Sequence, residues 1–123
     1  PSRERLQIST EITLPEDLPL AQIARHLPHL AEDLWRQTVR KNVQARTVTL
    51  KLKTADFRII TRSLTYSSAL PDAAALAQAA AALMKKVPPS ADDAYRLIGI
   101  GVGHLLPSGQ QQSLWQEAAE KAV

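Results

Sequence analysis

The stretch TVTLKLKTADFRIITRS, residues 47–63, places the tightest constraint on the fold. Residues 46–53 alternate between apolar and polar side chains, which is the period of a strand with one buried face. Residues 54–56 form a turn, and residues 57–64 form the return strand of a hairpin. The apolar face of the first strand carries Val48, Leu50 and Leu52, and its polar face carries Thr47, Thr49, Lys51 and Lys53. We therefore predict a sheet with one face in the core and one face open.

The return strand is less regular. Ile59 and Ile60 are adjacent, so either both faces of this strand are partly covered or a bulge shifts its alternation. The pattern leaves open whether Thr61 or Arg62 points to the open face. Phe57 has the parity of the apolar face, and we expect its ring on that side.

The segment before this hairpin predicts a strand and a helix. Residues 8–14 alternate as a short strand, and we expect Asp17 to cap the helix that follows. A single apolar stripe then recurs at spacings of three and four residues. It consists of Leu20, Ile23, Leu27, Leu30 and Leu34. Pro28 predicts a kink or restart in this helix, which should end near Asn42.

The segment after the hairpin repeats this order. Asp72 can cap a helix over residues 73–87, and residues 95–105 read as a last strand. Gly99, Gly101 and Gly103 alternate along that strand, where glycine is unfavourable. Either another backbone or a ligand approaches closely there, or this is an irregular edge strand.

The resulting order is β-α-β-β-α-β, which predicts an α+β fold of the split βαβ type. In this fold a four-stranded antiparallel sheet carries both helices on one face. Val48, Ile98 and their apolar neighbours would face the helices. The open face would carry the polar side chains of residues 47–53, Arg58 or Arg62, and the glycines of the last strand.

Charge is concentrated near the hairpin. The net charge is only +3, but residues 36–66 hold eight basic residues and one acid. This block indicates either a surface that faces a polyanion or a solvated sheet face. The chain has no cysteine, which excludes disulfides and thiolate zinc sites and fits a reducing compartment. No apolar run is long enough to span a membrane. The chain starts without Met or a signal stretch, so we expect a piece of a longer protein.

Catalytic signatures are poor. His26 and His29 lie three residues apart and lack the further ligands of a metal site. The GxGxG of residues 99–103 lies within a strand, not ahead of a helix, so it does not read as a nucleotide fingerprint. Lys and Thr side chains suit phosphate contacts. Aromatic residues make up only 4% of the chain. The open face therefore suits a duplex backbone better than stacked single-stranded bases, with little direct sequence readout.

Two long motifs carry a family resemblance. The run ARTVTLKLKTADFRIITRSLTY and the later run YRLIGIGVGHLLP, with STEITLPEDL near the start, resemble the little finger domain of Y-family translesion DNA polymerases. The bacterial DNA polymerase IV type is the most similar group. The resemblance implies an accessory domain that lies in the major groove of primer–template DNA and grips both backbones. It implies a bacterial, cytoplasmic parent whose palm holds the catalytic carboxylates and Mg²⁺, so this chain alone should need no cofactor and should not polymerise.

The resemblance also implies which residues would bind DNA and a sliding clamp. The candidates for DNA contact, weakest for the first two, are Ser9, Thr10, Thr47, Thr49, Lys51, Lys53, Arg58, Thr61, Arg62 and Ser63. The tail resembles the family's clamp-binding peptide through Gln111, Ser113, Leu114 and Trp115, with Trp where Phe is usual. A short amphipathic helix is the alternative for this tail. We predict a little finger domain over residues 1–106 and a clamp-binding tail over residues 107–123.

Three functions remain to be weighed. The first is a DNA-backbone-gripping module of an error-prone polymerase, whose partners are primer–template DNA, the sliding clamp and the other polymerase domains, with no membrane. The second is a protein-interaction domain of the same fold that binds no DNA by itself. A small split βαβ enzyme is a distant third, because the sequence offers no polar pocket.

Overall fold

A computed structural model describes residues 7–88, 94–103 and 105–107 of the chain. The elements follow the order β1 (Ile8–Leu18), α1 (Leu20–Ile23), η2 (Ala24–His26), α2 (Leu27–Arg40), β2 (Val43–Gln44), β3 (Thr47–Thr54), β4 (Ile59–Thr65), α3 (Ala73–Met84), β5 (Tyr95–Gly103) and β6 (Leu106–Pro107). The main sheet has the strand order β1-β5-β3-β4, and all its pairs are antiparallel. The predicted α+β fold is therefore confirmed.

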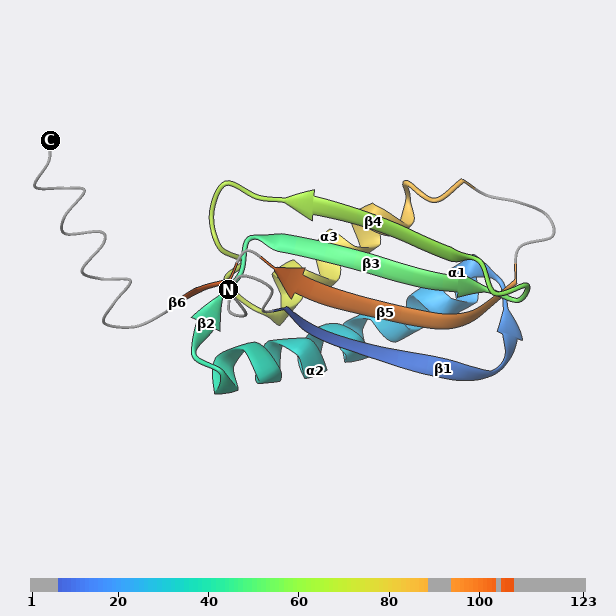
Figure 1. The fold of residues 1–123 in the computed structure, drawn as a ribbon, viewed down its shortest axis with the longest axis horizontal. Coiled ribbons are helices and arrows are strands. Elements are labelled where there is room, and N and C mark those ends of the chain that lie inside the picture. Colours follow the sequence, from blue (N-terminus) through green and yellow to red (C-terminus); the bar gives the residue numbers. More distant parts are fainter. Residues whose placement is uncertain (1–6, 89–93, 104, 108–123) are drawn as a thin grey trace, which may run out of the picture.

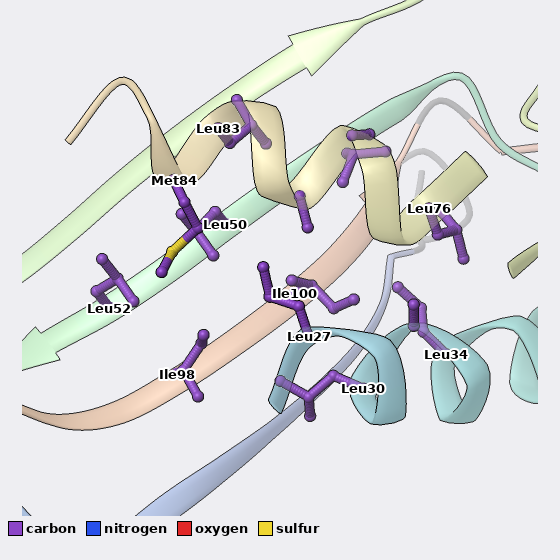
Figure 2. Packing of buried hydrophobic residues seen from close by; sticks show 14 of the residues in the cluster. Leu27, Leu30, Leu34, Leu50, Leu52, Leu76, Leu83, Met84, Ile98 and Ile100 are labelled. Carbon is purple, nitrogen blue, oxygen red and sulfur yellow. The ribbon is translucent and has the colours of Figure 1, made fainter. Parts of the chain in front are cut away.

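Both long helices pack on one face of this sheet (Figure 1). α2 contacts β1 and β5, α3 contacts β3 and β4, and the two helices contact each other. Figure 2 shows the layer between helices and sheet, where leucines of α2 and α3 meet side chains of β3 and β5. Leu30, Leu34, Leu50, Leu83 and Ile98 are each at most 1% exposed. Burying such side chains stabilises the fold by about 1.5–3 kcal/mol each. Within the part of the chain that the structure describes, both long helices lie on this face and the opposite face of the sheet carries no helix.

The start of the first helical segment differs from the prediction. Asp17 does not cap a helix, because β1 continues through Pro15 to Leu18. β1 is an edge strand, where a proline removes no essential ladder hydrogen bond. The helix α1 instead begins after Pro19, which provides no side-chain cap. The restart at Pro28 is confirmed, since a 3₁₀ turn precedes α2 and Pro28 lies in the first turn of α2.

The other boundaries lie close to those predicted. Asp72 caps α3 as expected, since its Oδ1 accepts a hydrogen bond from the Ala75 amide at 2.8 Å. α3 ends at Met84, three residues earlier than predicted, and β5 ends at Gly103. A small two-stranded sheet of β2 and β6 was not predicted. The predicted domain boundary between residues 106 and 107 lies within β6, and the division into domain and tail stays a prediction.

Candidate nucleic-acid interface

The open face of the sheet is built from cross-strand rows, because directly paired residues point to the same side. The rows are Thr13–Leu97–Lys53–Ile59, Glu11–Gly99–Lys51–Thr61, Ser9–Gly101–Thr49–Ser63 and Gly103–Thr47–Thr65. Lysine and apolar side chains lie toward the β3–β4 turn, and hydroxyl side chains lie toward the other end. The four polar residues that alternation assigned to the open face of β3 are all there.

A strip without side chains runs along β5 through the middle of this face. At Gly99 a Cβ would lie 2.7 Å from the Cβ of Glu11, and at Gly101 it would lie 3.2 Å from the carbonyl oxygen of Ile8. The predicted close approach of another backbone is therefore confirmed at these two positions. The alternative of an irregular edge strand is wrong, since β5 lies between β1 and β3.

The open face is less positively charged than the sequence indicated, because an acid lies beside the basic strand. Lys51 Nζ lies 3.5 Å from Glu11 Oε1, across the strip at Gly99. These side chains are 40% and 49% exposed, so the ion pair contributes little to stability. Sequence reasoning missed Glu11, because only the pairing of β1 with β5 brings this acid toward the basic strand. Thr47 and Thr65 share a hydrogen bond of 2.8 Å between their hydroxyl oxygens.

Two predicted contact residues lie on the other face of the sheet. Thr10 pairs with Ile100, and its hydroxyl donates to Asp33 Oδ2 on α2 at 2.8 Å. Arg62 pairs with Leu50, so it has the parity of the helix-covered face. The alternation of β4 is unbroken in its pairing with β3, so the bulge alternative is wrong. Thr61, not Arg62, therefore points to the open face.

Arg58 lies in the turn between β3 and β4, outside the paired rows. Its Nε is 3.2 Å from Asp56 Oδ2, and both side chains are 68% exposed. The Thr54 hydroxyl donates a hydrogen bond to Asp56, and this bond, with help from Arg58, holds the pKa of the Asp56 carboxyl below its usual value. Arg58 is thus at the end of the open face, already paired with an acid.

Phe57 and Arg96 are the surface features that sequence reasoning misplaced or missed. The Phe57 ring was expected on the apolar face, but it is 63% exposed and its residue has a φ of 70°. The Arg96 guanidinium carbon lies 4.2 Å from the ring centroid, and Lys53 Nζ lies 6.0 Å from it. The signal available in the sequence was that Phe57 directly follows a turn. Its positive φ, which directs the ring away from the core, depends on the geometry of that turn.

Several predicted features lie beyond this interface. The clamp-binding candidates Gln111, Ser113, Leu114 and Trp115 fall outside the described residues. Within the described ranges, no three His, Asp or Glu side chains gather closely enough to hold a metal ion. No helix of that same part of the chain is long and apolar enough to cross a membrane.

Known proteins resemble this chain at the level of both family and fold. The family model described as "impB/mucB/samB family C-terminal domain" matches residues 5–114. The protein named DNA polymerase IV of Neisseria meningitidis serogroup C is 77% identical over 113 residues, which are 92% of this chain. The chain spans about a third of the length of the curated relatives it matches, 32% in this case.

Solved structures share the fold at low sequence identity. A structure described as "Insertion ternary complex of Dbh DNA polymerase" has a TM-score of 0.73 and 13% identity, covering 84% of this chain and 29% of that one. A second is described as "Complex of beta-clamp processivity factor and little finger domain of PolIV". It has a TM-score of 0.66 and 20% identity, and it covers 85% of this chain and 94% of that one.

Proposed function

The chain belongs to the impB/mucB/samB family of C-terminal domains, as its resemblance to polymerase little fingers predicted, and on this premise we propose that it binds DNA for a Y-family polymerase. In this proposal the chain is the accessory domain of an error-prone translesion polymerase of the DNA polymerase IV type. Its open face grips the backbone of primer–template DNA without reading the sequence. Catalysis and Mg²⁺ belong to other domains of the parent, and this chain alone does not polymerise.

The observation that carries the proposal is the composition of the open face. Phosphate oxygens are contacted in protein–DNA complexes by Lys, Ser and Thr side chains. The rows of the open face present such groups on three strands, namely Ser9, Thr47, Thr49, Lys51, Lys53, Thr61 and Ser63. Gly99 and Gly101 place no side chain of β5 on this face between β1 and β3. Long amide readers are missing from these rows, which supports binding without sequence preference.

Three of the earlier candidates carry less weight in this proposal. Thr10 is engaged by Asp33 on the helix side, and Arg62 has helix-side parity. Arg58 is paired with Asp56 at the turn. We therefore assign the principal phosphate contacts to the lysines and hydroxyls of the rows. Arg58 and Arg62 are left as contacts from the end and the edge of the sheet.

The test is fluorescence anisotropy of a labelled primer–template duplex titrated with this chain at low and at moderate salt. We expect binding that weakens steeply with salt and does not depend on sequence, because release of counterions drives it. Lys51→Ala and Lys53→Ala should each weaken binding for all sequences alike and flatten the salt slope by about one unit. Lys86→Ala, which removes the same charge just after α3 on the helix side, is the matched control and should change little.

The outcomes separate this function from its rival. If the wild-type chain binds no duplex at any salt, the alternative of a protein-interaction domain without DNA binding is favoured. If Lys51→Ala altered the sequence preference of binding, Lys51 would contact a base rather than a phosphate. If Lys86→Ala weakened binding as much as Lys53→Ala, the open face would not be the interface.

A second proposed function is tethering to the sliding clamp. A little finger domain of the same fold has been solved in a complex described as containing the beta-clamp processivity factor, which supports this. The peptide Gln111–Trp115 would anchor Leu114 and Trp115 in an apolar groove of the clamp. We expect Leu114→Ala to lower the affinity for a bacterial sliding clamp more than tenfold in surface plasmon resonance. Gln112→Ala, at the variable position of the peptide, is the control, and equal losses in both variants would count against the motif.

A further inference from the structure

An exposed aromatic ring stands at the β3–β4 end of the open face. Among the described residues, Phe57 and Ile59 are large apolar side chains with 63% and 58% of their surface exposed. Ile59 belongs to the same cross-strand row as Lys53. Because so much of the Phe57 ring remains in water, core packing does not account for its position.

The backbone holds the ring there against a local cost. Phe57 has a φ of 70°, a conformation that a non-glycine residue adopts only when its surroundings impose it. The Phe57 amide donates to the Thr54 carbonyl at 2.9 Å, and the Arg58 amide donates to the Thr54 hydroxyl at 2.9 Å. Thr54 is only 3% exposed, so the turn is anchored in the core and fixes the residue that follows it.

Cations lie against this ring. The Arg96 guanidinium carbon is 4.2 Å from the ring centroid, which is a close cation–π distance, and Lys53 Nζ is 6.0 Å away. Arg96 lies where the pairing of β5 shifts register: Lys53 pairs with Leu97, but Thr54 pairs with Tyr95. Such an irregularity re-aims a side chain, and it accounts for Arg96 reaching a ring that also adjoins Lys53 of the open face.

We propose that Phe57, Arg96 and Lys53 form a stacking platform for an unpaired nucleobase of a DNA strand that continues beyond the duplex. This inference rests on the proposed function, since the duplex on the open face is what delivers the strand. Every base has a π-face, so an aromatic ring beside cations can hold it without reading its identity. Arg96 and Lys53 would neutralise the adjoining phosphates.

The charges at this end of the sheet favour DNA over a protein partner. Among the described residues, the cations of Arg58, Lys53 and Arg96 lie at the turn, and the Asp56 carboxylate there is paired with Arg58. A protein hot spot is a side chain enclosed by an apolar rim that excludes water. The Phe57 ring has a cationic rim instead, which suits a polyanion with exposed bases.

The test compares two overhangs on the same duplex. One duplex continues as a short single strand with normal bases, and the other continues as an equally long strand of abasic residues, which keeps every phosphate. We expect the wild-type chain to bind the strand with bases roughly tenfold more tightly in anisotropy titrations. Phe57→Ala should remove this difference without weakening binding to the blunt duplex. Phe57→Trp should keep it, because the indole also stacks.

A matched control removes an equally exposed apolar side chain that has no π-face. Ile59→Ala should leave the preference for the strand with bases unchanged. Circular dichroism melting of each variant verifies that it is folded, which is expected because both side chains are exposed.

The possible results distinguish a failure of the stacking platform from a failure of the proposed function. If the wild-type chain binds both overhangs equally, or if Phe57→Ala keeps the difference, the platform is wrong while duplex binding on the open face stands. If the wild-type chain does not bind the blunt duplex at all, the proposed function and the platform fail together. In that case a protein partner is the occupant to test next.

Discussion

At the scale of single residues, the glycines of β5 show how one missing side chain shapes a whole face. Gly99 lies between Glu11 and Lys51 in a cross-strand row, and the lack of a Cβ lets these two charged side chains meet over it. The three glycines are not equivalent. Among the described residues, an added Cβ at Gly103 would meet Gln7 Nε2 alone, at 3.9 Å.

This difference predicts that the same substitution costs much more stability at Gly99 than at Gly103. Gly99→Ala should lower the free energy of unfolding by about 1–3 kcal/mol, because its Cβ would lie 2.7 Å from the Glu11 Cβ and 3.0 Å from the Thr10 carbonyl oxygen. Both atoms belong to β1, and neither is the far end of a flexible side chain, so the neighbouring strand has little room to relax. Gly103→Ala is the control and should cost little. Urea unfolding of both variants measures this, and equal stabilities would refute the close approach of β1 to β5.

At the scale of elements, the β3–β4 turn is organised by a buried hydroxyl. Thr54 Oγ1 accepts a hydrogen bond from the Arg58 amide at 2.9 Å and donates to Asp56. We expect Thr54→Val to lower the free energy of unfolding by about 1–2 kcal/mol, because it removes both bonds while keeping the shape. It should also raise the pKa of Asp56 toward its usual value.

Thr54→Ser provides the matched variant for this turn. Serine keeps the hydroxyl, so the pKa of Asp56 should stay low in a carboxyl-carbon NMR titration. If the Thr54→Val variant is as stable as the wild type and its Asp56 pKa is as low as in the wild type, the proposed role of this hydroxyl is wrong.

A second link between elements joins β1 to α2. The Thr10 hydroxyl donates to Asp33 Oδ2, and this bond is the main cause that holds the pKa of Asp33 below its usual value of 3.8, with Arg36 and Gln37 contributing. A carboxyl with a lowered folded-state pKa stabilises the fold above the unfolded-state pKa. That contribution is lost as the pH falls through the lower, folded value.

We expect Thr10→Val to raise the pKa of Asp33 and to make stability less steep with pH below about 4. Ser9→Ala removes a neighbouring hydroxyl from the opposite face and should leave the Asp33 pKa unchanged. NMR titration of the carboxyl and urea unfolding across this pH range provide the two measurements. An equal pKa shift in both variants would argue against the direct bond.

At the scale of the whole molecule, the sheet has one face covered by helices and one open face that carries both basic and acidic side chains. Lys51, Lys53 and the single acid Glu11 set that balance within the rows. A bound phosphate backbone would be repelled by Glu11, which also holds Lys51 at 3.5 Å.

Glu11→Gln should therefore strengthen binding to duplex DNA, by on the order of 0.5–1 kcal/mol at low salt. Glu32→Gln changes the net charge equally but lies on α2, on the helix side, and should have a smaller effect. Anisotropy titrations at low salt distinguish the two variants. Equal gains would mean that net charge, not the open face, governs the association.

The sequence alone determined the fold class and much of the open face. Strict alternation in residues 47–53 assigns each side chain of β3 to a face, because a strand has a period of two. The stripe of α2, the restart at Pro28 and the Asp72 cap are equally local, since each depends on residues a few positions apart. The family motifs predicted the relationship that the family match confirms.

Only the tertiary structure decided which groups meet across strands. The pairing of β1 with β5 brings Glu11 within reach of Lys51, forty residues away in the sequence, across Gly99. It also directs the Thr10 hydroxyl toward Asp33 on α2. The register of β4 against β3 turns Arg62 away from the open face, and a turn anchored by Thr54 holds Phe57 at a positive φ beside Arg96. These relations depend on register and on turn geometry, which an alternation pattern does not contain, because both are set by packing between segments distant in sequence.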